Sequence, residues 1–232
     1  MGLEVQGLSK RYGDVLAVTD LSFRVGDGEI VGLLGPNGAG KTTTLHALAG
    51  LVHPSAGRAL LDGRPIEELR AEVGFVPEQP EVFPLLSVAE HLGFVARAYR
   101  LADGWRSEAE EILRRLDLDE VQDRPGGALS KGMKQKLLIA CALLHHPRVL
   151  LVDEPVVGLD PAGQAELWAA LRAVRAEGRS VLLSTHILSS VEEICDRVVI
   201  LRRGRLLAEG TLAEITAESG SLQEAFLDLT GE

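Results

Sequence analysis

The sequence predicts an α/β fold in which a mostly parallel sheet is covered by helices, and two observations lead to this prediction. Along the second half of the chain, short apolar segments typical of buried strands alternate with segments of helical periodicity, as expected for parallel strands joined by crossover helices. Earlier, the apolar segment Glu29–Leu34 runs directly into a glycine-rich stretch, and the helix-forming residues 42–49 follow before Gly50. A strand, a glycine-rich loop and a helix in this order favour phosphate binding.

The N-terminal region has a different pattern. Residues 3–8 and 16–25 form short β-like segments, and turn signals at Tyr12-Gly13 and around residues 26–28 bound them. Residues 73–76 are expected to form a further strand. We therefore expect an N-terminal antiparallel β subdomain before and around the first helix.

Residues 82–147 are expected to be helical. The sequences Ser87-x-x-Glu90 and Ser107-x-x-Glu110 match the capping box that starts helices, and apolar residues then recur at three- and four-residue spacing. A third helix is expected within residues 129–144. This block is interpreted as an α-helical subdomain inserted into a core made of residues 1–81 and 148–232, and residues 1–232 together are interpreted as a single domain.

The remaining elements return to the alternating order. Strands are expected at 149–152 and 180–183, helices at 162–176 and 188–195, and a hairpin at 197–201 and 205–208. The tail carries two more capping boxes, Thr211-x-x-Glu214 and Ser221-x-x-Glu224, and is expected to be helical.

Composition excludes several functional classes. A formal charge of −10 argues against general affinity for nucleic acid, since binding to a phosphate backbone needs a surplus of Lys and Arg. No apolar run reaches the roughly 18 residues that span a bilayer, and the N-terminus has no apolar signal segment. Cys141 and Cys195 lie in apolar segments without metal-ligand spacing, so we expect buried, reduced side chains.

The stretch Gly35–Thr42 reads GPNGAGKT and matches the phosphate-binding pattern G-x-x-x-x-G-K-[ST]. Its glycines allow consecutive N–H groups to converge on an anion, Lys41 reaches the β- and γ-phosphates, and Thr42 offers its hydroxyl to Mg²⁺. An ordinary glycine-rich turn is the alternative, but the flanking strand and helix favour a P-loop NTPase core. The nucleotide-binding candidates here are Gly35, Pro36, Asn37, Gly38, Ala39, Gly40, Lys41, Thr42 and Thr43.

Three more polar side chains follow expected strands. Asp153 ends an apolar strand, at the sheet edge where ligands bind, and is a candidate to hold Mg²⁺ with Thr42. Glu154, next in sequence, is suited to act as a general base on the attacking water. An Asp-Glu pair after a strand is also typical of a solvated turn. His186 ends another apolar strand, where a lone histidine is more often structural than catalytic; beside a γ-phosphate it would donate to the transferring oxygens.

Together these motifs resemble the nucleotide-binding subunit of an ABC (ATP-binding cassette) transporter over essentially the whole chain. Leu129–Met133, which reads LSKGM, is similar to the family signature LSGGQ; Ser130 and Gly132 are retained, whereas Lys131 and Met133 replace a glycine and a glutamine. Tyr12 resembles the aromatic that stacks on adenine, although alone it would be an ordinary strand aromatic. The sequence Gly158-Leu159-Asp160 resembles the loop through which two such subunits contact each other.

The family's metal-contacting glutamine aligns most nearly with Glu78, and Gln79 follows one position later; either side chain is a candidate to reach the metal. These departures, with residues 83–92, resemble the branch that powers ABC-2-type exporters.

The resemblance implies a function that one copy of the chain performs only in part. ATP and Mg²⁺ on one subunit would be completed by Ser130 and Gly132 of a second one, in a homodimer or heterodimer. Lys41 and His186 would neutralise the transferring phosphoryl while Glu154 orients water. The pair would drive a separate transmembrane permease from the cytoplasmic face of the membrane. The alternatives are a non-transport ABC-family ATPase and a regulatory nucleotide-binding protein.

Overall fold

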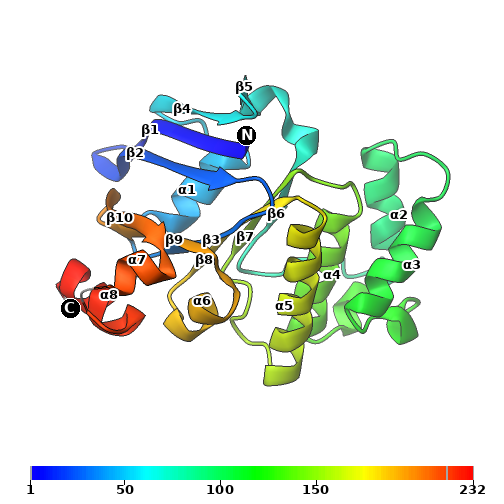
Figure 1. The fold of residues 1–232 in the computed structure, drawn as a ribbon. Coiled ribbons are helices and arrows are strands. Elements are labelled where there is room, and N and C mark those ends of the chain that lie inside the picture. The colour runs from blue at the N-terminus through cyan, green and yellow to red at the C-terminus, as the bar shows by residue number, and fades with distance from the viewer. Residues whose placement is uncertain (1, 218, 232) are drawn as a thin grey trace.

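The structure is a computed structural model that describes residues 2–217 and 219–231, and it contains two sheets flanked by helices (Figure 1). The strands are β1 (Gly2–Tyr12), β2 (Val15–Gly26), β3 (Ile30–Leu34), β4 (Ala56–Leu61), β5 (Arg64–Pro65), β6 (Val73–Val76), β7 (Val149–Asp153), β8 (Ser180–Thr185), β9 (Arg197–Arg202) and β10 (Arg205–Thr211). The helices are α1 (Lys41–Leu48), α2 (Val88–Ala98), α3 (Trp105–Arg115), α4 (Lys131–Leu143), α5 (Pro161–Ala176), α6 (Leu188–Ile194), α7 (Leu212–Thr216) and α8 (Leu222–Thr230).

The two sheets differ in strand direction. The smaller sheet has the order β2-β1-β4-β5 and is antiparallel. The larger has the order β10-β9-β3-β8-β7-β6, in which only the edge strand β10 runs antiparallel to its neighbour. This arrangement confirms the expected α/β fold with a mostly parallel sheet and an N-terminal antiparallel sheet.

Burial explains the two sequence patterns. Every residue of β3, β7 and β8 is buried, because both faces of the larger sheet are covered, and such strands read as continuous apolar runs. Strands β1 and β2 cover the core with one face only, so buried residues alternate along them with more exposed ones.

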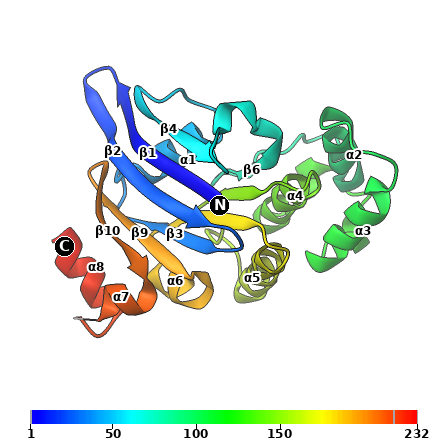
Figure 2. The ribbon, with the colours of Figure 1, turned by 45° about the horizontal axis from the view of Figure 1, so that its top comes forward.

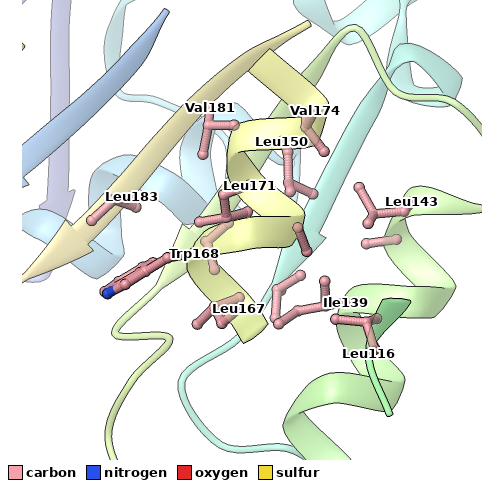
Figure 3. Packing of buried hydrophobic residues seen from close by; sticks show 14 of the residues in the cluster. Leu116, Ile139, Leu143, Leu150, Leu167, Trp168, Leu171, Val174, Val181 and Leu183 are labelled. Carbon is pink, nitrogen blue, oxygen red and sulfur yellow. The ribbon is translucent and has the colours of Figure 1, made fainter. Parts of the chain in front are cut away.

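Two apolar clusters lie on the two faces of the larger sheet. One joins it to α1 and to the inner face of the smaller sheet; the other joins it to α4, α5 and α6 and extends to α2 and α3. Figure 3 shows part of the second cluster, where Trp168 and Leu171 of α5 pack against Leu183 and Leu150 of the sheet. Figure 2 shows α2 and α3 at the side of the sheet beyond β6.

Helix starts follow the expected caps with one exception. Ser87 and Thr211 form the predicted reciprocal capping boxes, and Ser221 accepts the backbone N–H of Glu224. The prediction at Ser107 was wrong, because α3 starts at Trp105 with Gly104 as its cap. Trp105 packs against the second cluster, which also contains residues of α4 and α5. The helix includes Trp105, so Ser107 lies within its first turn.

The two cysteines are free, and burial raises the pKa of each thiol to about 12. Within residues 2–217 and 219–231, no helix combines the length and the apolar character needed to cross a membrane.

Candidate nucleotide-binding site

A cavity of about 670 Å³ opens where the loops after β3, β7 and β8 meet. Its lining comes from residues 15–17, 37–43, Glu78, Glu154, Val157, His186 and Arg203. The strands β3, β8 and β7 are neighbours and run in the same direction, so the segments that leave their carboxyl ends converge here.

The glycine-rich loop connects β3 to α1 and is held from both sides. Lys41 is only 7% exposed, and its ammonium donates to the carbonyl of Gly35 at 2.7 Å. On the other side, the backbone N–H of Gly204, in the turn between β9 and β10, donates to the carbonyl of Ala39 at 3.0 Å. The carbonyl of Gly204 in turn accepts from the N–H of Thr19 at 2.7 Å. The C-terminal hairpin and β2 therefore brace the loop.

Glu154 stands at the centre of the polar groups. Its Oε1 lies 3.6 Å from Nζ of Lys41 and 3.0 Å from Nδ1 of His186, while the backbone N–H of His186 reaches Oε2 at 3.4 Å. Lys41 and Glu154 are both buried, whereas the His186 side chain is half exposed toward the cavity. The structure thus brings together three side chains that are 113 and 32 residues apart in sequence (154 − 41 and 186 − 154).

Asp153 lies at the end of β7 and is 1% exposed. Its Oδ1 accepts a hydrogen bond from the hydroxyl of Ser184, the residue opposite it on β8. Thr42, in contrast, is exposed in the cavity.

The oxygen donors near the phosphate loop suit a hard cation. Thr42 and Glu78 line the cavity, whereas Gln79 is not part of its lining. In the part of the chain that the structure describes, no three His, Cys, Asp or Glu side chains cluster as a metal cage. Magnesium is bound by one or two carboxylates together with substrate phosphates and water, rather than by an all-protein cage, so this donor set fits Mg²⁺.

Several predicted residues do not line the cavity. Gly35 and Pro36 begin the loop, and their carbonyls accept hydrogen bonds from the ammonium of Lys41. Tyr12 is 45% exposed at the end of β1, next to Val15 of the cavity wall, and the ammonium of Lys10 lies 4.9 Å from its ring centroid.

Ser130, Gly132 and Asp160 also lie outside the cavity. Ser130 and Asp160 are the N-caps of α4 and α5. Gly132 faces Leu159, and the side chain of Lys131 lies directly over Gly158. The signature segment and the end of the loop before α5 are therefore in contact, and none of Ser130, Gly132 and Asp160 lines the cavity of the same chain.

The sequence did not point to Arg203 or Val157, both of which line the cavity. Arg203 is recognisable only as part of a hairpin turn, and its place beside the phosphate loop follows from β9 pairing with β3, a strand order that spacing does not reveal. Val157 belongs to the turn after Glu154, and its side chain carries no chemical signal that the sequence analysis could use.

The fold and this cavity together define a P-loop nucleoside triphosphatase, in which Lys41 of a braced glycine-rich loop lies beside Glu154, directly after buried Asp153 at the end of a parallel strand.

Comparisons with known proteins narrow this class. The sequence model described as ABC transporter matches residues 18–157. Nod factor export ATP-binding protein I of Burkholderia orbicola is 42% identical over 213 residues, which covers 90% of this chain and 70% of that protein. Daunorubicin resistance ATP-binding protein DrrA3 of Streptomyces coeruleorubidus is 37% identical over 94% of this chain and 71% of its own length.

Solved structures agree. One described as an ATP binding subunit of an ABC transporter is 37% identical, covers 99% of both chains and has a TM-score of 0.92. CbiO1 from Clostridium perfringens, described as part of the transporter complex CbiONQ, is 32% identical over 93% of this chain and 90% of its own, with a TM-score of 0.82.

The chain belongs to the ABC transporter family, as an ATP-binding subunit that hydrolyses ATP to power transport. The family resemblance drawn from the sequence motifs is thereby confirmed.

Proposed function

We propose that this chain hydrolyses ATP with Mg²⁺ in the cavity described above, as half of a dimer that drives export through a separate transmembrane permease. The observation that carries the catalytic part is the convergence of Lys41, Glu154 and His186 at the cavity wall. Export is supported by the relatives named for Nod factor export and daunorubicin resistance.

Each side chain has a definite task in this proposal. Lys41 neutralises the β- and γ-phosphates, which the N–H groups of residues 37–43 surround. Thr42, Asp153 and Glu78 supply the oxygen atoms that would hold Mg²⁺, and when bound the ion offsets charge on the terminal phosphates. Glu154 orients the attacking water and accepts its proton. His186, which shares Glu154 as a partner, donates to the transferring phosphoryl.

The signature residues act in a second copy. Ser130 and Gly132 sit at the start of α4, away from the cavity of their own chain. The exposed surface they share with Gly158 and Asp160 is positioned to cap the nucleotide of another subunit, as the family resemblance implies. Tyr12 would extend the wall formed by Val15 toward the adenine. Dimer closure on ATP and opening after hydrolysis would supply the motion that the permease uses.

The test compares Glu154→Gln with the wild type. The exchange keeps the shape of the side chain but removes its basicity, so phosphate release is expected to fall by about 10²- to 10⁴-fold. ATP binding should persist, and a dimer that requires ATP should accumulate in size-exclusion chromatography. Turnover equal to wild type would refute the assignment of Glu154, and a monomer at all ATP concentrations would refute the paired site.

The permease is tested separately. A tagged Glu154→Gln chain is purified in the presence of ATP from detergent-solubilised membranes of its own source. An integral membrane protein is expected to co-purify with it. Recovery without any membrane protein would favour the regulatory nucleotide-binding alternative.

A further inference from the structure

We propose that Ser184, at the carboxyl end of β8, is a positioning residue for ATP hydrolysis, because its hydroxyl fixes Asp153 and Glu154 relative to each other. This proposal rests on the proposed roles of those two carboxylates, and it adds the group that connects them.

The hydroxyl of Ser184 contacts both residues. It donates to Oδ1 of Asp153, and its oxygen accepts the backbone N–H of Glu154 at 3.2 Å. Because the Ser184 oxygen accepts the N–H of Glu154, its own hydrogen is available to Asp153. Ser184 is fully buried and Asp153 and Glu154 nearly so, which makes each of these bonds costly to lose.

The backbone explains why this connection matters. The chain leaves β7 at Glu154 with a φ of +45°, a left-handed conformation that is unfavourable for a non-glycine residue and needs support from its surroundings. The N–H of Glu154 is shared between the carbonyl of Ser184 at 3.1 Å and its hydroxyl. Two acceptors from one residue thus hold the turn that points the Glu154 side chain toward Lys41 and His186.

The parallel register sets Ser184 in place. Asp153 pairs with Ser184 at the last position of the β7–β8 ladder, and two residues later His186 contacts the carboxylate of Glu154. The end of β8 therefore contacts both proposed catalytic carboxylates. The hydroxyl thus orients the Asp153 carboxylate, which would help to hold Mg²⁺ in the proposed function.

The same strand offers a matched control. Ser180, at the other end of β8, is 3% exposed, and its hydroxyl donates to the carbonyl of Gly26 at 2.7 Å. Ser180→Ala removes a buried hydroxyl with one hydrogen bond and touches neither carboxylate residue, whereas Ser184→Ala removes a buried hydroxyl with two hydrogen bonds, one to Asp153 and one from Glu154.

The experiment measures ATP hydrolysis against Mg²⁺ concentration for Ser184→Ala, Ser184→Thr, Ser180→Ala and Glu154→Gln, with ATP affinity in EDTA as a second readout. Partners that orient metal ligands typically contribute 10- to 100-fold to metal affinity or activity. Ser184→Ala is therefore expected to raise the Mg²⁺ concentration for half-maximal rate by about tenfold and to lower kcat, while metal-free ATP affinity stays within twofold. Ser184→Thr, which keeps the hydroxyl, should recover most of the loss, and Ser180→Ala should match wild type in both readouts.

The outcomes distinguish a failure of the Ser184 proposal from a failure of the proposed function. If Glu154→Gln is inactive but Ser184→Ala shows the metal dependence and kcat of Ser180→Ala, Ser184 has no positioning role and the proposed function remains. If Glu154→Gln hydrolyses ATP at the wild-type rate, the proposed function itself fails. Should Ser184→Ala fail to fold, Ser184→Cys replaces it, because a thiol nearly keeps the volume of the hydroxyl but is a weaker hydrogen-bond donor. Its Mg²⁺ dependence and kcat are then compared with those of Ser180→Ala in the same way.

Discussion

Substituting Gly40 by alanine probes the phosphate loop where it packs closely against β2, and Gly38 in the same loop provides the control. Both glycines have positive φ, +103° at Gly40 and +78° at Gly38. A Cβ on Gly40 would lie 2.7 Å from the carbonyl oxygen of Ala17 in β2, whereas a Cβ on Gly38 would have no atom within 4 Å.

The contacts give different magnitudes for the two variants. The left-handed backbone costs alanine about 1–2 kcal/mol at either position. Only Gly40→Ala adds the overlap with Ala17, and inserting a methyl into packed structure costs about 1–3 kcal/mol. The unfolding free energy should therefore fall by about 2–5 kcal/mol for Gly40→Ala and about 1–2 kcal/mol for Gly38→Ala. At about 2–4 °C per kcal/mol for a chain of this size, Tm should fall by about 4–20 °C and 2–8 °C respectively.

Thermal unfolding in the absence of nucleotide measures this difference directly, and ATP titration measures its consequence. Because Gly40 immediately precedes Lys41 and Thr42 at the start of α1, a displaced Gly40 moves both side chains, so ATP affinity should fall by at least tenfold. Equal Tm values for the two alanine variants would show that the contact with β2 does not constrain the loop and would refute the reasoning.

Three further predictions follow from other parts of the molecule. Lys131→Gln should weaken ATP-dependent self-association of the Glu154→Gln protein by about tenfold at low salt, and more than Lys134→Gln does. The reason is that Lys131 lies over Gly158 on the proposed dimer surface, and charged hydrogen bonds contribute about 1.5–3 kcal/mol. Equal effects of the two substitutions in analytical ultracentrifugation would contradict this prediction. Burial raises the pKa of Cys141 and Cys195 to about 12, so both thiols should react with iodoacetamide near neutral pH only after unfolding, and rapid alkylation of the native protein detected by mass spectrometry would count against it. Burial also lowers the pKa of His145, which stacks on Tyr99, so the folded state favours the neutral imidazole. The contribution of this neutral side chain to the free energy of unfolding is fully present above about pH 6.5 and is lost as the pH falls. His145→Gln should therefore flatten the decline of Tm between about pH 7 and pH 5.

The sequence predicted the elements whose burial leaves a simple pattern. Strands β3, β7 and β8 were recognisable because they are buried on both faces and read as continuous apolar runs. The loop after β3 was recognisable from the spacing of its glycines and Lys41, which matches the phosphate-binding pattern. The start of α3 was misplaced because a capping motif at Ser107 is a local signal, whereas the true boundary is set by the packing of Trp105.

Contacts made through strand order were not predictable in the same way. Gly204 braces the phosphate loop, and Ser184 bridges the two carboxylates, only because β9 and β8 both pair with β3 and β8 also pairs with β7. Neither residue type nor spacing indicates such neighbours. The choice between Glu78 and Gln79 was similarly open, since only the course of the chain after β6 places Glu78 at the cavity.

If the paired site of the proposed function is correct, a single chain is expected to hydrolyse ATP poorly. The cavity brings together a cation, a carboxylate and a histidine, from the start of α1 and from the segments that follow β7 and β8. The start of α4, with N–H groups and a serine suited to the opposite side, belongs to a different surface of the same chain. Since charge in the transition state spreads over all the equatorial oxygens of the transferred phosphoryl, groups on one side alone leave part of it unbalanced. A second copy that presents its α4 to the cavity would supply the missing groups, so hydrolysis and association are expected to depend on protein concentration together.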